Sequence, residues 1–496
     1  MTDLLQLNSS DTVAVVLRSL KKGELLPFGG GKLRILDDIP AGHKVAVCVM
    51  AEGSTVVKYG HPIGTVTREI SAGQWVHSHN MHSSLKEISE YSYQESSVPV
   101  PKTSRTPQNF MGFRREDGRV GIRNEVWIIP TVGCVSSVAK DIAARVENEI
   151  GTSVDGVYAF EHPYGCSQLG DDLENTRRAL AGLIRHPNAG GVLVLGLGCE
   201  NNSIADMKAA LGPVDPNRVK FLVCQECGDE IEEGTALVKQ LCDFAGHYRR
   251  EPVPMSELIV GLKCGGSDGF SGITANRLLG VFADRLASEG GSAVMSEVPE
   301  MFGAETILLS RCVSQEVFDR TVRMINGFKA YFLRNGEGLS ENPSPGNKAG
   351  GITTLEEKSL GCVQKGGNAP VVDAIPYGDP VRRHGVTLLS APGNDLVSTS
   401  AEAVSGAHLI LFTTGRGTPF GSPVPTVKIS SNTALSQYKK NWIDFNAGDL
   451  LEDVSLEAKS ETLYEFVRAI ASGEIKTKNE RGGMREIAIF KNGITL

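Results

Sequence analysis

The sequence predicts an α/β protein in which a small N-terminal β domain precedes layers of helices on largely parallel sheets. Its 496 residues exceed the roughly 250–300 that a single core accommodates, so two or three domains are expected. Short β-rich runs separated by glycines fill residues 11–82. From about residue 109, apolar runs alternate with helical patterns, and this alternation is typical of parallel sheets covered by helices.

Four segments divide the chain. Residues 1–82 form the predicted β domain, and the polar, proline-rich residues 83–108 have the composition of a linker. Residues 109–250 and 251–496 are predicted as two α/β domains, with the boundary at the proline-containing string RREPVPMSE. Their strands are expected to form Rossmann-like sheets.

Within the β domain, glycine turns separate the predicted strands. These strands are expected at Thr12–Leu17, Lys44–Val49, Ser54–Tyr59 and Gln74–His77. In the α/β region, four apolar runs each end in a loop that contains glycine or cysteine. They cover residues 126–132, 192–197, 219–223 and 258–262.

Helices are expected between these strands. Apolar residues at helical spacing between Ala139 and Ile150 predict a helix with Ser136 or Ser137 as its N-cap. A second helix is expected near Asp171, and residues 386–413 predict a further strand–helix–strand unit.

The composition excludes several classes of partner. A net charge of -8 provides no basic field for nucleic acid or an anionic membrane surface. No stretch reaches the roughly 18–20 apolar residues of a membrane span, and the first residues lack a signal-peptide pattern. A cytoplasmic protein is expected, in which the ten cysteines are reduced thiols available for metal binding or catalysis.

Four cysteines follow predicted strands directly. Cys134, Cys199, Cys224 and Cys264 each stand where a strand gives way to a loop. Because strand carboxyl ends line the ligand crevice of open α/β sheets, the four thiols are candidates for one iron or zinc site. The alternative is that they are small buried residues. The C-x-x-C pair at Cys224 and Cys227 has no second pair at zinc-ribbon spacing and no redox context.

Histidines form a second candidate site. His77 and His79 would share one face of a strand and form half of a metal site, which His43 and His82 are able to join from neighbouring turns. The alternative is a pair of surface histidines without a ligand.

Anion-binding candidates flank the strands of the α/β region. Arg123 stands beside Asn124 at the end of an arginine-rich stretch, and arginine binds carboxylates in bidentate fashion. The loop residues Gly265, Gly266 and Ser267 offer backbone N–H groups, and Arg416 stands in a similar glycine-containing loop. The chain has no Walker A motif and no complete dinucleotide fingerprint, so no nucleotide cofactor is expected.

Several long strings resemble the altronate dehydratase and galactarate dehydratase family. They are GFRREDGRVGIRNEVWIIPTVGCVSSVA, HPYGCSQLGDD, GGVLVLGLGCENN, GLKCGGSDGFSGITAN and SEVPEMFGAE. The N-terminal strings GHKVAV, VVKYGHPIG and VHSHN resemble the SAF domain of that family, which has a β-clip fold. The resemblance implies a metal-dependent hydro-lyase that uses Fe2+, with Mn2+ as the alternative.

The resemblance also implies a sugar-acid substrate and a 2-keto-3-deoxy product. D-altronate, which would give 2-keto-3-deoxy-D-gluconate, is the first expectation, and galactarate or another aldarate or aldonate is the second. Two further alternatives are a sulfolactate sulfo-lyase, which releases sulfite, and a non-catalytic sugar-acid-binding protein. A homo-oligomer, most simply a dimer, is expected.

The residues themselves support a working mechanism. Its hard step is removal of the proton next to a carboxylate, which a metal assists by stabilising the developing charge. The expected metal ligands are His77 and His79, completed by a cysteine thiolate or a carboxylate from the α/β region; the thiolate candidates are Cys134, Cys199 and Cys264, and Glu200 is a carboxylate alternative. Arg123 would hold the substrate carboxylate. The candidates for general acid and base are His162, Lys58 and Glu200.

Overall fold

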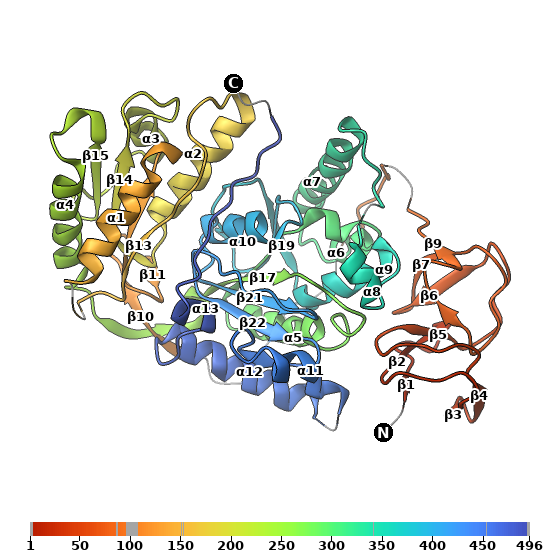
Figure 1. Cartoon of the computed structure of the whole chain (residues 1–496). Helices are drawn as coiled ribbons and strands as arrows, with labels where there is room; N and C mark the ends of the chain where they lie inside the picture. Colours follow the sequence, from red (N-terminus) through yellow and green to blue (C-terminus); the bar gives the residue numbers. More distant parts are fainter. Residues whose placement is uncertain are drawn as a thin grey trace.

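The computed structural model describes residues 3–85, 88–95, 108–149, 151, 153–340, 342–452 and 454–493. It has an N-terminal β domain, a second domain and a C-terminal domain. Figure 1 shows the C-terminal domain in the middle, with the N-terminal domain and the second domain on opposite sides of it. None of the described helices is long and apolar enough to cross a membrane.

The N-terminal domain consists of short antiparallel strands in three small sheets. The first sheet has β1 (Leu4–Leu5), β2 (Val13–Val16), β5 (Lys44–Ala46) and β8 (Trp75–Val76). The other two contain β3 (Leu25–Phe28) and β4 (Gly31–Arg34), and then β6 (Thr55–Lys58), β7 (His61–Val66) and β9 (Met81–His82). All four strands predicted in this domain are present, each shorter than expected.

The second domain is built on a four-stranded parallel sheet in the order β13-β12-β14-β15. Its strands are β12 (Glu125–Pro130), β13 (Val157–Ala159), β14 (Ala189–Gly196) and β15 (Val219–Val223). Every residue of β12 and β14 is buried, because helices cover both faces of the sheet. The helical elements are η1 (Gly133–Val135), α1 (Ser136–Glu147), α2 (Gly170–Arg185), α3 (Ile204–Leu211), η2 (Cys224–Glu226) and α4 (Glu230–Ala245).

The predicted α1 and α2 are confirmed, but the predicted cap of α1 is wrong. The N-cap of α1 is Val135, without a side-chain bond, because the preceding turn η1 already leads the chain into the helix. In α2, Asp171 in the first turn and Arg185 in the last turn complement the helix dipole. A small antiparallel sheet of β10 (Asn109–Arg114), β11 (Val120–Gly121) and β16 (Arg250–Pro254) lies at the base of this domain.

The C-terminal domain has a seven-stranded parallel sheet in the order β19-β20-β18-β17-β21-β22-β23. Its strands are β17 (Ile259–Cys264), β18 (Ser292–Met295), β19 (Val371–Ile375), β20 (Gly385–Leu389), β21 (Leu409–Thr414), β22 (Thr426–Ser430) and β23 (Phe445–Asn446). The α-helices are α5 (Ala275–Ser288), α6 (Glu305–Leu309), α7 (Gln315–Arg334), α8 (Pro345–Ala349), α9 (Leu355–Val363), α10 (Asp395–Val404), α11 (Thr433–Tyr438), α12 (Leu456–Ala471) and α13 (Lys478–Arg481). The 3-10 turns are η3 (Met255–Glu257), η4 (Val298–Met301), η5 (Gln364–Gly366) and η6 (Gly448–Leu451).

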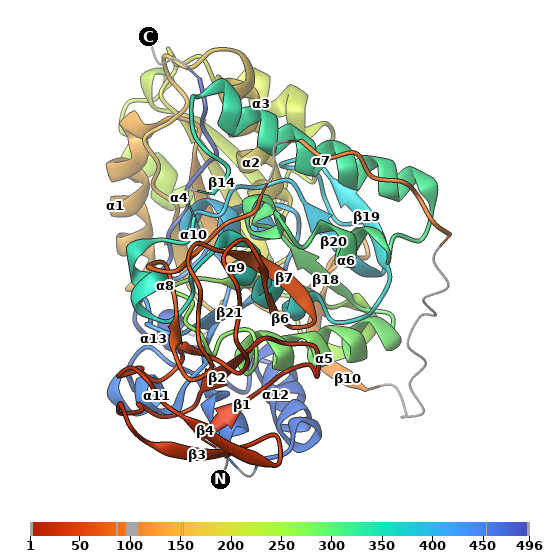
Figure 2. The same cartoon turned by 90° about the vertical axis from the view of Figure 1, so that its right-hand side faces the viewer.

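The N-terminal domain packs against the segment that holds α8 and α9. Figure 2, which turns this side toward the viewer, shows the short strands in front of α9 and α5. The largest apolar core is continuous across this contact: it includes Val56 and Ile63 of the N-terminal domain together with Leu278 and Phe282 of α5. The sheet edge at which β17 and β18 end therefore lies close to the N-terminal domain.

Candidate functional site

Two thiols and two carboxylates meet inside the C-terminal domain. The ligand atoms of Cys264, Glu297, Glu300 and Cys362 lie within 4.8 Å of one another, and all four residues are buried. The Cys264 sulfur is 3.5 Å from the Cys362 sulfur and 3.4 Å from Glu300 Oε2. We call these four residues the Cys–Glu cluster.

The fold brings the cluster together from three directions. Cys264 is the last residue of β17, and Glu297 and Glu300 follow its parallel neighbour β18, so the two strands deliver three ligands to one sheet edge. Cys362 comes from α9, which packs over this edge. Glu297 has a φ of 66°, a left-handed conformation that is uncommon for a residue with a side chain and is often found at functional sites.

Three lysines surround the two carboxylates. Lys263 and Lys365 both contact the Glu297 carboxylate, and Lys358 Nζ lies 2.9 Å from Glu300 Oε1. Burial alone would raise the pKa of Glu300, but the ammonium groups, Lys358 foremost, lower it to about 2. Lys263 also lies 2.9 Å from Asp395. The positive charges of the three lysines are thus balanced by the negative charges of three carboxylates. The two thiols of the Cys–Glu cluster are not needed for this charge balance.

This donor set fits a divalent transition metal. Thiolates and carboxylates are ligands of iron and zinc, and two thiolates would balance the charge of one divalent cation in otherwise neutral surroundings. The hydrogen bond to Cys362, together with burial, raises the pKa of the Cys264 thiol well above its ordinary value. A bound cation would favour the thiolate form.

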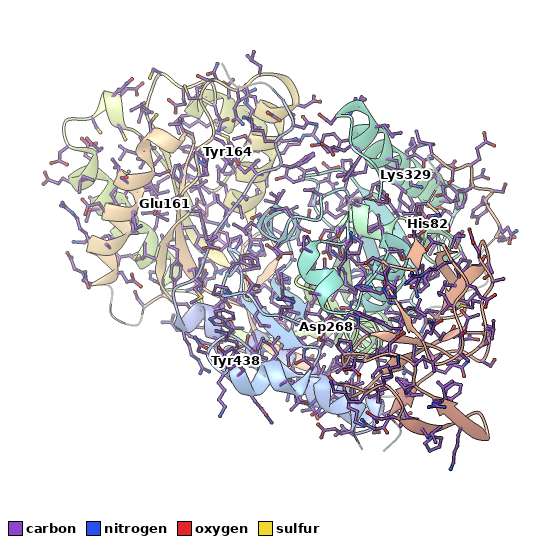
Figure 3. All side chains as sticks on the ribbon, turned by 45° about the vertical axis from the view of Figure 1, so that its right-hand side comes forward. His82, Glu161, Tyr164, Asp268, Lys329 and Tyr438 are labelled. Atoms are coloured by element: carbon purple, nitrogen blue, oxygen red, sulfur yellow. The ribbon has the colours of Figure 1, made fainter. Side chains whose placement is uncertain are left out.

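A cavity adjoins the cluster at the boundary with the N-terminal domain. About 290 Å³ of space lies among its lining atoms and open mouth, of which about 10 Å³ admits a water-sized molecule in this structure, and Cys264 and Cys362 form part of its wall. Lys58 and Tyr59 contribute from the N-terminal domain, and Asp268 contributes from the loop after β17. Figure 3 shows Asp268 at this boundary, next to the strands of the N-terminal domain.

Lys58 reaches the cavity as one of a buried pair of lysines. Lys58 Nζ lies 2.8 Å from Glu357 Oε1, and Lys44 Nζ lies 2.8 Å from Glu357 Oε2. Burial would lower the pKa of Lys58, but the Glu357 carboxylate raises it above the ordinary value. Burial lowers the pKa of Lys44 to about 8, because Glu357 offsets only part of the desolvation. Lys58 therefore carries a proton at neutral pH.

Asp268 also lines the cavity. Its oxygens accept hydrogen bonds from Ser271 and Ser431, both at 2.8 Å, and from Asn432 at 3.0 Å. Burial raises the pKa of Asp268 above its ordinary value although these bonds oppose the shift. The cavity thus holds a cationic acid and a carboxylate of increased basicity.

His77 and His79 do not share a strand face. Strand β8 ends at Val76, and residues 77–80 form a turn in which Asn80 and Met81 donate to the His77 carbonyl. His77 is buried with Nδ1 2.8 Å from Thr353 Oγ1, whereas His79 is exposed. The premise that placed the two rings on one face is therefore wrong, and neither belongs to the Cys–Glu cluster.

The four cysteines after predicted strands do not meet. Cys134, Cys199 and Cys224 follow β12, β14 and β15 of the four-stranded sheet, whereas Cys264 ends β17 of the seven-stranded sheet. The expectation of one shared site is wrong, because sequence does not reveal which strands share a sheet. Of the predicted metal ligands, only Cys264 joins the Cys–Glu cluster.

The predicted substrate-binding residues fall into two places. Arg123 is buried and bonded to Glu480, and Asn124 bonds to Arg115 and Ala245, so both act in domain packing. The loop of Gly265, Gly266 and Ser267 lies beside the cavity, where Ser267 forms part of the wall. Arg416 lies next to Gly266, is exposed and donates to the Gly346 carbonyl.

His162 and Glu200 both belong to the second domain, whereas Lys58 belongs to the N-terminal domain. His162 Nε2 is 2.8 Å from the Pro130 carbonyl, and its Nδ1 accepts from the Tyr164 amide. Glu200 accepts from Thr131 at 2.6 Å and from two backbone amides. These contacts hold the loops at the end of the four-stranded sheet, and a catalytic role for either residue stays a prediction.

Several site residues were not predicted. Glu297 and Glu300 stand directly after a buried strand, which was the available signal, in the string SEVPEMFGAE. Cys362, Lys358 and Glu357 lie on α9, and their sequence context shows nothing but an ordinary helix.

Three family models match consecutive parts of the chain. Residues 2–84 match the altronate/galactarate dehydratase SAF domain, and residues 112–246 match the D-galactarate dehydratase/altronate hydrolase second domain. Residues 255–495 match the D-galactarate/altronate dehydratase C-terminal domain.

Curated relatives match over the whole length. The chain is 52% identical to the altronate dehydratase of Bacillus subtilis (strain 168), with 100% of both chains covered. It is 48% identical to the altronate dehydratase of Escherichia coli (strain K12), with 99% of each covered. It is 31% identical to the galactarate dehydratase (L-threo-forming) of the same strain, with 98% of this chain and 96% of that one covered. The chain therefore belongs to the altronate/galactarate dehydratase family.

Proposed function

We propose that this chain dehydrates D-altronate to 2-keto-3-deoxy-D-gluconate in the cavity beside the Cys–Glu cluster. The observation that carries the proposal is the 52% identity with an altronate dehydratase over the full length of both chains. The identity with the galactarate dehydratase is lower, at 31%. The cavity supplies the chemistry that removal of water from a sugar acid requires.

The charges around the cavity suit an anionic substrate. Lys58, which is buried, and Lys358, which is 10% exposed, both form part of its wall, and each ammonium group pairs with a carboxylate. An ammonium group in a site of low dielectric constant attracts a carboxylate more strongly than one exposed to water. Ser267 on the adjoining loop adds a hydroxyl that is able to bind a sugar-acid oxygen.

The residues of the Cys–Glu cluster are those that would hold the metal, Fe2+ first and Mn2+ as the alternative. When bound, a divalent metal supplies a Lewis acid that stabilises negative charge on a substrate carboxylate, a contribution of several kcal/mol. The lysines around Glu297 and Glu300 pair with both carboxylates and fix their orientation.

Lys58 and Asp268 are the proposed proton carriers. Lys58 holds a proton at neutral pH and would donate it to the departing hydroxyl group. Asp268 would accept the proton from the carbon next to the carboxylate, a role that its raised pKa favours. The two residues belong to different domains, so the proposed reaction requires the N-terminal domain to be docked.

The test is an anaerobic assay of the iron-loaded chain against D-altronate, galactarate and sulfolactate, with 2-keto acid and sulfite as the products measured. Keto acid from D-altronate at a rate well above that from galactarate supports the proposal. Preferential turnover of galactarate or release of sulfite overturns the substrate, and no product from any of the three overturns the enzymatic function.

A further inference from the structure

The second domain carries a separate set of thiols at the carboxyl edge of its parallel sheet. Cys134 follows β12, Cys166 follows β13 and Cys199 follows β14, and these three strands are neighbours in the order β13-β12-β14. All three cysteines are exposed. Free cysteine is among the residues most often buried, so three exposed thiols at one sheet edge call for an explanation.

Hydrogen bonds tie the three cysteine loops to one another. The Gly133 amide donates to the Tyr164 carbonyl at 2.8 Å, and the Asn202 amide donates to the Gly165 carbonyl at 2.9 Å. Thr131 donates to Glu200 at 2.6 Å, which joins the first loop to the third. Each bonded residue lies within four residues of its cysteine, so each pair of the three loops is joined by a hydrogen bond.

Each of the three cysteines directly follows a glycine, at positions 133, 165 and 198. A Cβ on Gly165 would lie 2.0 Å from the Thr131 carbonyl oxygen, and one on Gly133 would lie 2.8 Å from the His162 carbonyl oxygen. The glycines therefore permit a backbone approach that a larger residue would prevent. The glycines thus let the loops that carry Cys134 and Cys166 pack directly against each other.

Each cysteine lies in the segment between its strand and the following helix, α1, α2 or α3. Among the residues that the structure describes, groups of three ligand atoms within 4.8 Å occur only at the Cys–Glu cluster. The three sulfur atoms therefore do not all lie within 4.8 Å of one another, which is compatible with a polynuclear centre.

We propose that Cys134, Cys166 and Cys199 bind an iron–sulfur cluster, distinct from the metal of the Cys–Glu cluster. Iron–sulfur clusters are held by cysteine thiolates, and three protein thiolates leave one iron open to a non-protein ligand. The exposure of this edge gives such a ligand direct access. Figure 3 shows Tyr164, which stands two residues before Cys166, in the second domain and well apart from Asp268.

The experiment is anaerobic reconstitution of the full chain with Fe2+ and sulfide, followed by measurement of iron, acid-labile sulfide and visible thiolate-to-iron absorption. The wild type is expected to retain sulfide and to absorb in the visible range. Cys134→Ser, Cys166→Ser and Cys199→Ser should each lose both signals while their far-ultraviolet circular dichroism stays unchanged. Cys48→Ser, an exposed cysteine of the N-terminal domain, and Cys264→Ser should retain both signals.

The inference would be overturned if the reconstituted wild type contained no sulfide, or if it bound iron without sulfide. It would also be overturned if the three cysteine variants retained sulfide. Loss of sulfide in the Cys264 variant would overturn it as well. The measurement does not depend on turnover: active protein without sulfide overturns this inference alone, and sulfide-containing protein inactive on every sugar acid overturns the proposed function alone.

Discussion

Lys58 and Glu357 join the N-terminal domain to the C-terminal domain with 2.8 Å between Nζ and Oε1, although 299 residues separate them in the chain. Both side chains are 2% exposed, and Lys44 shares the same carboxylate. One carboxylate thus pairs with two buried ammonium groups, of which Lys58 lines the cavity.

Glu357→Gln should reduce the stability strongly, because it leaves Lys44 and Lys58 buried without a counter-charge. Loss of one partner of a buried ion pair destabilises a protein by about 3–5 kcal/mol. Denaturant unfolding measures this difference. Asp38→Asn removes the exposed ion pair with Lys21 and should leave the unfolding midpoint unchanged. An equal effect of the two substitutions would contradict the importance of the buried pair.

Lys58→Met should lower turnover of D-altronate by about 10²–10⁴-fold, the range expected for loss of a general acid. Since Glu357 raises the pKa of Lys58 above its ordinary value of 10.5, the wild type should show no alkaline fall in rate from this group below that pH. The measurement is kcat/KM against pH. Lys32→Met changes an exposed lysine of the same domain and serves as the control. Wild-type kcat/KM in the Lys58 variant would remove Lys58 from the mechanism.

Gly269→Ala should separate the N-terminal domain from the cavity. A Cβ at position 269 would lie 1.9 Å from the Gly42 carbonyl oxygen, so one of the two backbones must move. We expect a lower unfolding temperature and loss of turnover, with circular dichroism unchanged. Gly327→Ala, in α7 with nothing within 4 Å of the added atom, should be neutral or stabilise by about 0.5–1 kcal/mol. Wild-type activity of Gly269→Ala would show that docking is not required.

Stability should fall as the pH drops from 6.5 toward 4. Burial lowers the pKa of His408 to about 4, so the unfolded chain binds a proton in this window that the folded chain does not. Each such group contributes about 1.4 kcal/mol per pH unit to the slope. His408→Asn, in which the amide oxygen can replace Nδ1 as acceptor for Ile259, should reduce the slope by that amount. The exposed His384→Asn is the control, and an unaltered slope in the His408 variant would refute the assignment.

The fold was predictable because its strands are short, apolar and separated by glycine-containing loops. β12, β14, β15 and β17 all lie within the predicted runs or within three residues of them. The division of these strands between two sheets was not predictable, since it depends on packing between distant segments. This is why Cys264 was identified as a ligand candidate but was grouped with cysteines of another sheet.

The remaining site residues depend on the tertiary fold. Cys362 is 98 residues from Cys264, and Glu357 acquires its role only through Lys44 and Lys58 of another domain. The prediction that His77 and His79 share one face of a strand was wrong because β8 ends one residue before His77. The local pattern is compatible with a strand, and the turn that replaces it is fixed by Asn80, whose side chain accepts from the His77 amide at 2.9 Å.

The most direct test of the proposed site is the Cys264→Ser, Cys362→Ser double variant, measured for D-altronate turnover and for the rise in unfolding temperature on anaerobic addition of Fe2+. Both should be lost, because metal binding to the folded state raises its stability and the variant lacks two of the four ligands. Cys312→Ser, a buried cysteine of the same domain outside the cluster, should retain both. Wild-type turnover in the double variant would contradict the placement of the reaction at the Cys–Glu cluster.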